Sequence, residues 1–405
     1  MAVIRSFRAL RPARDTAPAV SSVPYDVVNT DEARQLAAGN PLSFLHVTRS
    51  EIDLPAGTDP YSPQVYEKAR QQLAALRISA PLVVEDEPAI YLYRLRMGGH
   101  EQTGITACFS VDEYEQDVIR KHERTRPDKE DDRTRHIIEL RAQTGVVFLT
   151  YRASEAIDRR CRAVTADAPL FDFRADDGVH HTIWRVMGPE ATALVDAFDR
   201  IPALYIADGH HRAASAARAR ADMRAQGDSR EADAFIAVAF PSNQMQILPY
   251  NRTVKDLAGR TPGQFLAALG ALVPVREGPA TPRGKGEVAM FLDGKWYGVD
   301  LSGAAPADAS RASALDVALL QHHVLEPLLA IGDVRIDKRI DFVGGARGTA
   351  ALEGAVHAGK AAVAFSMHPV TIEDLMAISD EGGIMPPKST WFEPKLRDGL
   401  LVHLI

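Results

Sequence analysis

The stretch from Ala203 to Arg218 constrains the fold of this 405-residue chain more than any other. It begins with an apolar run of strand character, and an alanine-rich segment typical of a helix follows directly after Asp208-Gly209. A strand that turns through glycine into a helix leaves backbone N–H groups without partners at the positive end of the helix dipole. The sequence therefore predicts an anion site at this turn, of the kind that binds phosphate.

Three polar side chains come directly after the glycine. His210, His211 and Arg212 add hydrogen-bond donors that match phosphate oxygens. We expect His210 and His211 to act in catalysis. We expect Asp208, Gly209 and Arg212 to bind phosphate or nucleotide. The alternative is a polar turn between a core strand and a helix, with histidines that are merely solvated.

The segment 121–136 is exceptionally rich in charged residues and mostly helical by propensity. Its basic side chains suit a lid or clamp on phosphates. Glu123 and Glu130 are possible ligands for Mg²⁺, which prefers oxygen. The alternative is a solvated helix face with charges at one-turn spacing. The phosphate ligands expected in this segment are Lys121, His122, Arg126, Lys129 and Arg133.

A third polar group lies near the C-terminus. Two consecutive prolines fix the backbone just before Lys388, Ser389 and Thr390, which offer one cation and two hydroxyls together. This loop is expected to close over a ligand phosphate. A rigid terminal loop packed by the aromatic residues that follow is an equal alternative.

Composition excludes several classes of protein. The net charge of −7 argues against a nucleic-acid-binding face, and the chain has no run of about 18 apolar residues that would span a membrane. The two cysteines do not form a CxxC pair, so we expect a cytoplasmic location. Neither a GxxxxGK[ST] loop nor a GxSxG motif occurs, which speaks against a P-loop enzyme and a serine hydrolase.

Strand-like and helix-like segments alternate irregularly along the chain. This favours an α+β fold with a mixed sheet over a regular doubly wound sheet. We expect a nucleotide-binding portion with insertions over residues 1–255 and a C-terminal α+β portion over 256–405. Within the first portion, the patterns predict strands over 20–28 and 42–47 and a helix over 61–78.

Four motifs occur in the order found in a family of bacterial and archaeal proteins. With them the chain resembles domain-of-unknown-function family 1015 over nearly its whole length. The family name by itself implies no activity. The motifs are Val23-Pro24-Tyr25-Asp26, Lys121-His122-Glu123, Asp208-Gly209-His210-His211-Arg212 and Pro386-Pro387-Lys388-Ser389-Thr390.

The turn from Asp208 to Arg212 is also similar to the Gly-x-x-Arg signature of the ParB/sulfiredoxin superfamily. In that superfamily a strand–Gly–helix turn binds nucleotide phosphates, and some members are kinases of free serine. The resemblance implies that Gly209 to Arg212 hold the phosphates of ATP or ADP. It also implies that Asp26 acts as the base, although those kinases have Glu at the comparable place.

These observations predict a nucleotide-dependent kinase that transfers phosphate from ATP or ADP to a small hydroxyl substrate, with free serine as the named candidate and Mg²⁺ as the metal. Two alternatives stay open: a ParB-type nucleotide-binding regulator without turnover, and a phosphatase of a small phosphoester. A ParB-type regulator would carry a basic DNA-binding module, and no convincing helix-turn-helix is present. The expected partners are the substrate and the nucleotide, not nucleic acid or a membrane, and the oligomeric state stays open.

Overall fold

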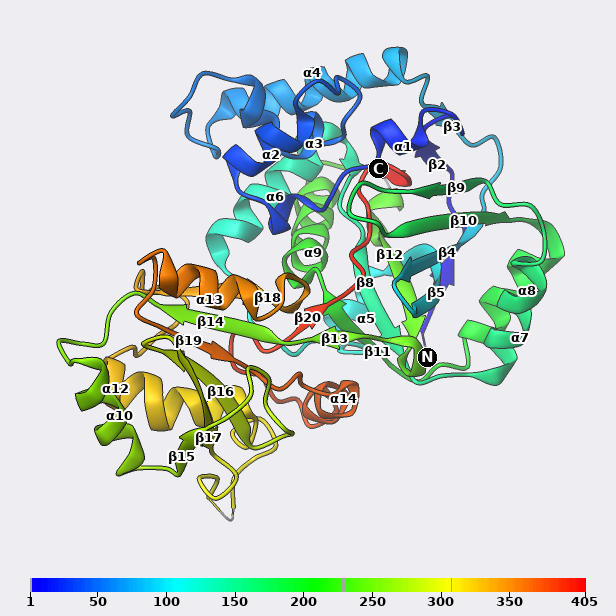
Figure 1. Ribbon diagram of the computed structural model, residues 1–405. Helices are drawn as coiled ribbons and strands as arrows, with labels where there is room; N and C mark the ends of the chain where they lie inside the picture. The colour runs from blue at the N-terminus through cyan, green and yellow to red at the C-terminus, as the bar shows by residue number, and fades with distance from the viewer. Residues whose placement is uncertain (1, 228–229, 307) are drawn as a thin grey trace. The chain divides into compact units, whose positions relative to one another are not determined.

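The computed structural model describes residues 2–227, 230–306 and 308–405 (Figure 1). Its contacts divide the chain into two units, the first of residues 1–245 and 394–405 and the second of residues 246–393. This division differs from the expected one of 1–255 and 256–405, because the final segment of the chain returns to the first unit.

A mixed sheet forms the centre of the first unit. The β11/β6 and β12/β8 pairs are parallel, whereas β11/β8 and the pairs from β12 to β9 are antiparallel. This mixture, with helices of irregular order, confirms the expected α+β class. The strand order is β6 (Ile119–Arg120), β11 (Leu204–Asp208), β8 (Val147–Tyr151), β12 (Ala234–Pro241), β5 (His100–Ser110), β4 (Ile90–Met97), β10 (His180–Val186) and β9 (Phe171–Arg174), with β1 (Ile4–Arg5) paired to β5.

Helices of the first unit pack on this sheet and around it. Phe235 and Ala237 of β12 share a core with Ala213 and Ala216 of α9, whose small side chains let the helix approach the sheet closely. The helices are α1 (Ala17–Val20), η1 (Tyr25–Val27), α2 (Thr30–Ala37), α3 (Leu45–Thr48), η2 (Ser50–Asp53), α4 (Pro63–Ser79), α5 (Val111–Glu115), α6 (Pro127–Leu140), α7 (Glu155–Val164), α8 (Gly188–Phe198), α9 (His210–Ala225), η3 (Arg230–Asp233) and η4 (Ser242–Gln244).

The expected helix over 61–78 is confirmed by α4, but the two expected strands are wrong. Residues 25–27 form the 3-10 helix η1, and residues 45–48 form the helix α3. Phe44 and Val47, three positions apart, are both buried in one core cluster. Three-residue spacing brings side chains to one face of a helix, whereas a strand would place them on opposite faces.

A small second sheet ties the two ends of the first unit together. It pairs β21 with strands from residues 9–11 and 142–143, and so places the C-terminal segment beside the N-terminal part of the chain. Because of this pairing, Lys395 and Asp398 belong to the first unit. The strand order is β3 (Val83–Val84), β2 (Ala9–Arg11), β21 (Val402–Leu404) and β7 (Ala142–Gln143).

The second unit has its own antiparallel sheet and its own core. Its strand order is β15 (Val275–Glu277), β17 (Lys295–Asp300), β16 (Glu287–Leu292), β19 (Val363–Ser366), β14 (Tyr250–Val254) and β18 (Ile340–Gly344), with β13 (Ile247–Leu248) paired to β20 (Trp391–Phe392). Its helices are α10 (Pro262–Gly270), α11 (Asp316–Leu320), the π-helical turn η5 (Gln321–Leu325), α12 (Glu326–Leu329), η6 (Gly345–Arg347), α13 (Ala350–His357) and α14 (Ile372–Asp380).

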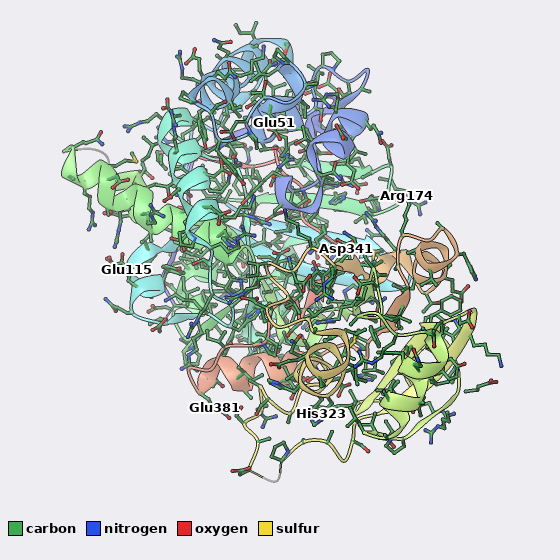
Figure 2. All side chains as sticks on the ribbon, turned by 90° about the vertical axis from the view of Figure 1, so that its left-hand side faces the viewer. Glu51, Glu115, Arg174, His323, Asp341 and Glu381 are labelled. Atoms are coloured by element: carbon green, nitrogen blue, oxygen red, sulfur yellow. The ribbon has the colours of Figure 1, made fainter. Side chains whose placement is uncertain are left out.

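Charged side chains are exposed on both units, for example Glu115 on α5 and Glu381 just after α14 (Figure 2). Across the described ranges, no helix is both long and apolar enough to cross a membrane.

Candidate functional site at the start of helix α9

The turn between β11 and α9 has the strand–Gly–helix geometry that the sequence predicts. Strand β11 ends at Asp208, Gly209 adopts a left-handed conformation with φ of +95°, and α9 begins at His210. No side chain caps the N-terminus of this helix. The first-turn N–H groups of a helix are the donors that suit an anion, and the helix dipole adds a partial positive charge there.

Two glycines make room for the side chain of Arg212. A Cβ atom on Gly209 would lie 3.3 Å from the Arg212 Nη1 and 3.4 Å from the Cα of Val147. A Cβ atom on Gly145 would lie 3.1 Å from the Cδ of Arg212. The Arg212 side chain therefore passes between two backbone positions that tolerate little more than glycine.

Arg212 is buried and its guanidinium is engaged within the protein. Its Nη1 donates to the Val146 carbonyl oxygen, and its Nη2 donates to both carboxylate oxygens of Asp26 at 2.8 and 3.1 Å. Burial disfavours its charge, yet the carboxylates of Asp26 and Asp208 hold the pKa of Arg212 above its ordinary value. Arg212 thus joins η1 to α9, and Asp26, expected as the base, lies directly beside it.

A lysine that the sequence analysis missed pairs with Asp208. The Lys395 Nζ donates to the Asp208 carboxylate at 3.0 Å, and the Arg212 Nη2 lies 3.9 Å from the other Asp208 oxygen. Burial opposes ionisation of Asp208, but the two cations keep its pKa well below its usual range. No spacing in the sequence connects Lys395 with Asp208, since the return of the C-terminal segment to the first unit brings them together.

Asp398 is a second carboxylate that the sequence analysis missed. It is 1 % exposed, and its Oδ2 has no hydrogen-bond partner within the described part of the chain. Burial raises the pKa of Asp398 to about 7, against the opposing effect of the Arg212 charge. The charge of Asp26 raises the pKa further. Asp398 is therefore a carboxyl group that changes its charge near neutral pH.

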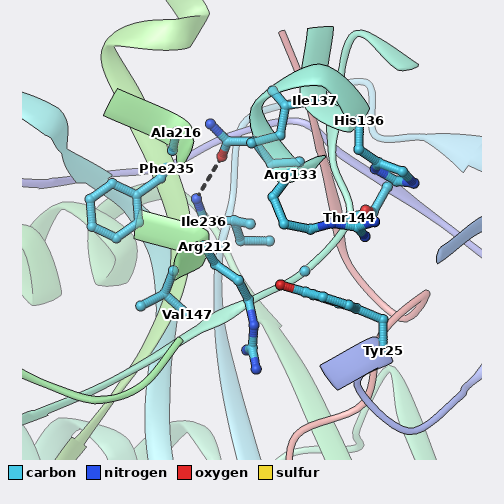
Figure 3. A pocket seen from close by; sticks show the side chains of 12 residues that line it. Tyr25, Arg133, His136, Ile137, Thr144, Val147, Arg212, Ala216, Phe235 and Ile236 are labelled. Carbon is cyan, nitrogen blue, oxygen red and sulfur yellow. Dashed lines mark hydrogen bonds between the residues drawn. The ribbon is translucent and has the colours of Figure 1, made fainter. Parts of the chain in front are cut away.

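A pocket lies beside Arg212, and Tyr25, Arg133 and Thr144 are among the residues that line it (Figure 3). The Arg133 Cζ lies 4.2 Å from the centre of the Tyr25 ring, and the Arg212 Cζ lies 6.0 Å from it. Arg133 also donates to Asp132 at 2.8 Å. Burial raises the pKa of Tyr25, so its hydroxyl stays protonated near neutral pH.

The two histidines of the turn bind the segment that follows β6. The His210 Nε2 accepts from the backbone N–H of His122 at 3.4 Å, and the His211 Nε2 accepts from the backbone N–H of Arg126 at 3.0 Å. Burial lowers the pKa of His122 to about 4 and that of His210 well below the ordinary value, so both rings are neutral at pH 7. The structure thus brings His122, His210 and His211 together.

Helix α6, within the expected clamp, packs against α9 through one face. The Ser215 hydroxyl donates to the Glu130 carbonyl oxygen at 3.2 Å, and Asp132, Thr134 and His136 are buried. This excludes a wholly solvated helix for 127–140. Its expected phosphate ligands nevertheless have partners in the protein: Lys121 pairs with Asp117, Arg126 with Asp128, Lys129 with the Tyr61 hydroxyl, and Arg133 with Asp132.

The expected C-terminal ligands belong to the second unit. Lys388 is exposed and has a left-handed φ of +58°, with its Nζ 5.6 Å from the centre of the Tyr250 ring. Ser389 is buried, and its hydroxyl donates to the Pro386 carbonyl oxygen. Thr390 is half-buried. These residues form a folded turn of that unit, and their contact with phosphate stays a prediction.

The chain belongs to the family described as protein of unknown function (DUF1015), which matches residues 4–318. This confirms the resemblance that the four motifs indicate. Comparison with the curated proteins finds no match.

Three solved structures can be compared with this chain. SbnI with a C-terminal truncation from Staphylococcus aureus is 13 % identical, with 74 % of this chain and 87 % of that chain covered and a TM-score of 0.40. A free serine kinase in complex with AMP is 12 % identical, with 73 % and 91 % covered and a TM-score of 0.39. A conserved hypothetical protein from Pyrococcus furiosus is 13 % identical, with 74 % and 95 % covered and a TM-score of 0.37. At these TM-scores the alignments assign neither a ligand nor an activity to this chain.

Proposed function

We propose that this protein binds a nucleotide through its phosphates at the N-terminus of α9 and transfers a phosphoryl group to a small hydroxyl compound, with free serine as the first acceptor to test. The observation that carries the proposal is the uncapped start of α9 after the left-handed Gly209. Helix N-termini of this kind supply backbone donors to phosphate. Lys395, next to Asp208, adds a cation at the same turn.

Asp26 is the proposed acceptor of the substrate proton. Its side chain is 34 % exposed, and Arg212 orients its carboxylate from the buried side. In the transfer, the substrate oxygen would form a bond to the terminal phosphorus as the bond from that phosphorus to the ADP oxygen breaks. The hydroxyl proton would pass to the Asp26 carboxylate. The charge of Arg212 would stay with the protein as a positioning group.

Magnesium fits the carboxylates of this site. Asp26 and Asp208 are 34 % and 30 % exposed and offer the oxygen ligands that Mg²⁺ prefers. When bound, Mg²⁺ would neutralise negative charge on the phosphates. The chain itself would position Asp208 through Lys395 and Asp26 through Arg212.

The substitution Asp26→Asn tests the proposal. It keeps the shape of the side chain but removes the proton acceptor, so we expect phosphoryl transfer to serine to fall by about 10²- to 10⁴-fold. Nucleotide affinity should stay within a few-fold of the wild-type value. Isothermal titration with ATP and Mg²⁺ measures binding, and radiolabelled phosphate transfer measures turnover. Asp31→Asn, an exposed carboxylate of the neighbouring helix α2, is the matched control.

Three results would contradict the proposal. Unchanged transfer in Asp26→Asn would remove Asp26 as the proton acceptor. Absence of nucleotide binding by the wild-type protein would end the kinase hypothesis. Hydrolysis of phosphoserine without any nucleotide would favour a phosphatase instead.

We also propose that Lys388, Ser389 and Thr390 contribute a second contact to the bound phosphates. Lys388 is exposed on its turn, so its replacement should leave the second unit folded. Loss of an exposed cationic contact should weaken ATP binding by about 3- to 10-fold in Lys388→Ala. An unchanged dissociation constant would remove this loop from the binding site.

A further inference from the structure

We infer that His122, Glu123 and His210 form a binding site for a divalent transition-metal ion of the Zn²⁺ class. One ring nitrogen from each histidine and one carboxylate oxygen of Glu123 all lie within 4.8 Å of one another. This inference does not rest on the proposed function, because it uses neither the nucleotide nor Asp26.

The backbone places these three residues together. His122 and Glu123 follow directly after β6, and His210 is the first residue of α9, just beyond β11. Strands β6 and β11 pair in parallel, so the segments that leave their carboxyl ends start from the same edge of the sheet. The centres of the His122 and His210 rings are 4.4 Å apart at an interplanar angle of 88°.

A buried polar atom without a partner supports the inference independently. The His122 side chain is 2 % exposed, and its Nδ1 has no hydrogen-bond partner among the described residues. A buried polar atom of this kind costs free energy unless another group satisfies it. A metal ion held with His210, itself 5 % exposed, would satisfy the Nδ1 lone pair.

The donor set selects the class of metal. Two imidazoles and one carboxylate suit Zn²⁺ and similar ions, at bond lengths of about 2.0–2.2 Å. Ligand atoms around such a tetrahedral ion lie about 3.4 Å apart, so binding would draw the three side chains slightly closer. Three protein ligands leave a fourth position for water or for an oxygen of a bound anion. Mg²⁺ would be a poor occupant because it prefers an oxygen environment.

Metal content of the full-length protein tests this site directly. After removal of metal with a chelator, the wild-type protein should bind one equivalent of Zn²⁺ in equilibrium dialysis followed by elemental analysis. Co²⁺ in the same site should produce the visible absorption of a coordinated ion with nitrogen ligands. Both measurements are made without nucleotide, so absence of ATP binding would leave the result for the metal site unaffected.

Three variants make the test specific. Glu123→Gln and His122→Gln should each weaken Zn²⁺ binding by about 100-fold or more, since even the loss of an outer hydrogen-bond partner of a metal ligand costs 10- to 100-fold. His180→Gln, a partly exposed histidine on β10, should bind as the wild type does. Glu123 is half-buried, which keeps its variant informative if the His122 variant fails to fold. Zn²⁺ should also raise the thermal unfolding temperature of the wild type but not of Glu123→Gln. The absence of a stoichiometric ion, or equal binding in Glu123→Gln and the wild type, would overturn the inference.

Discussion

Replacing Asp398 by asparagine should remove a pH dependence from the stability of the first unit. The carboxyl group is 1 % exposed and has its pKa raised to about 7, chiefly by burial. In the unfolded chain an aspartate titrates near pH 3.9. Between about pH 4 and pH 7 the folded protein therefore holds a proton that the unfolded chain has released.

The sign of the effect follows from this difference in bound protons. The folded state binds more protons in that window, so the free energy of unfolding falls as the pH rises from about 4 to 7. Each pH unit is worth about 1.4 kcal/mol, so the difference reaches about 4 kcal/mol above pH 7. Asparagine has a similar shape and does not titrate. Asp398→Asn should therefore match the wild type near pH 4 and exceed its stability by up to this amount at pH 8.

Urea unfolding at a series of pH values measures this difference. Trp184 is buried in the core of the first unit, so its fluorescence reports on that unit, and circular dichroism provides a second probe. Asp176→Asn, an exposed carboxylate, serves as the control and should follow the wild-type profile. Parallel profiles for Asp398→Asn and the wild type between pH 4 and 8 would refute the reasoning, because Asp398 would then be ionised in the folded protein throughout.

Two further substitutions test the geometry of the α9 turn. Gly209→Ala should destabilise the first unit by about 1–3 kcal/mol, because alanine is strained at a φ of +95° and its Cβ would lie 3.3 Å from Arg212. Thermal melting measures this, and Gly227→Ala, with open space around its Cβ and a φ of +78°, separates the cost of the left-handed backbone from that of the close contact. Arg212→Ala should lower the free energy of unfolding by about 3 kcal/mol in urea titrations, since it leaves Asp26 and a buried carbonyl group without their donor. A loss of nucleotide affinity without any loss of stability would mean that Arg212 binds the ligand rather than the protein interior.

Local patterns carried most of the site that could be predicted. The apolar run before Asp208 and the alanines after Gly209 indicate the strand and the helix, and a Gly between them predicts the left-handed turn, all confirmed. These features depend on neighbours in the chain. The same reasoning was wrong for residues 42–47, because the apolar residues of a short buried segment fit a strand or one helical turn equally well until their partners are known.

Charge patterns, by contrast, did not reveal which cations have partners inside the protein. Lys121, Arg126 and Lys129 look equivalent in the sequence, but each has a nearby acceptor on its own or a packed element. Arg212 was expected at the phosphate, and its guanidinium instead donates to Asp26 and to the Val146 carbonyl oxygen. An arginine donates to whichever acceptors lie within its reach, and that depends on packing.

The sequence by itself determined the strand–Gly–helix turn, the α+β class and the family, because these depend on local propensity and on motifs read along the chain. Only the tertiary structure decided that Lys395 and Asp398 join the turn around Asp208 and Arg212, 183 or more positions away in the chain. It likewise decided that His122 and Glu123 lie beside His210. The physical reason is that strand pairing sets these approaches: β21 carries the C-terminal segment into the first unit, and β6 lies parallel to β11. Contacts between segments so far apart in sequence depend on the pairing of the whole sheet, which no local pattern specifies.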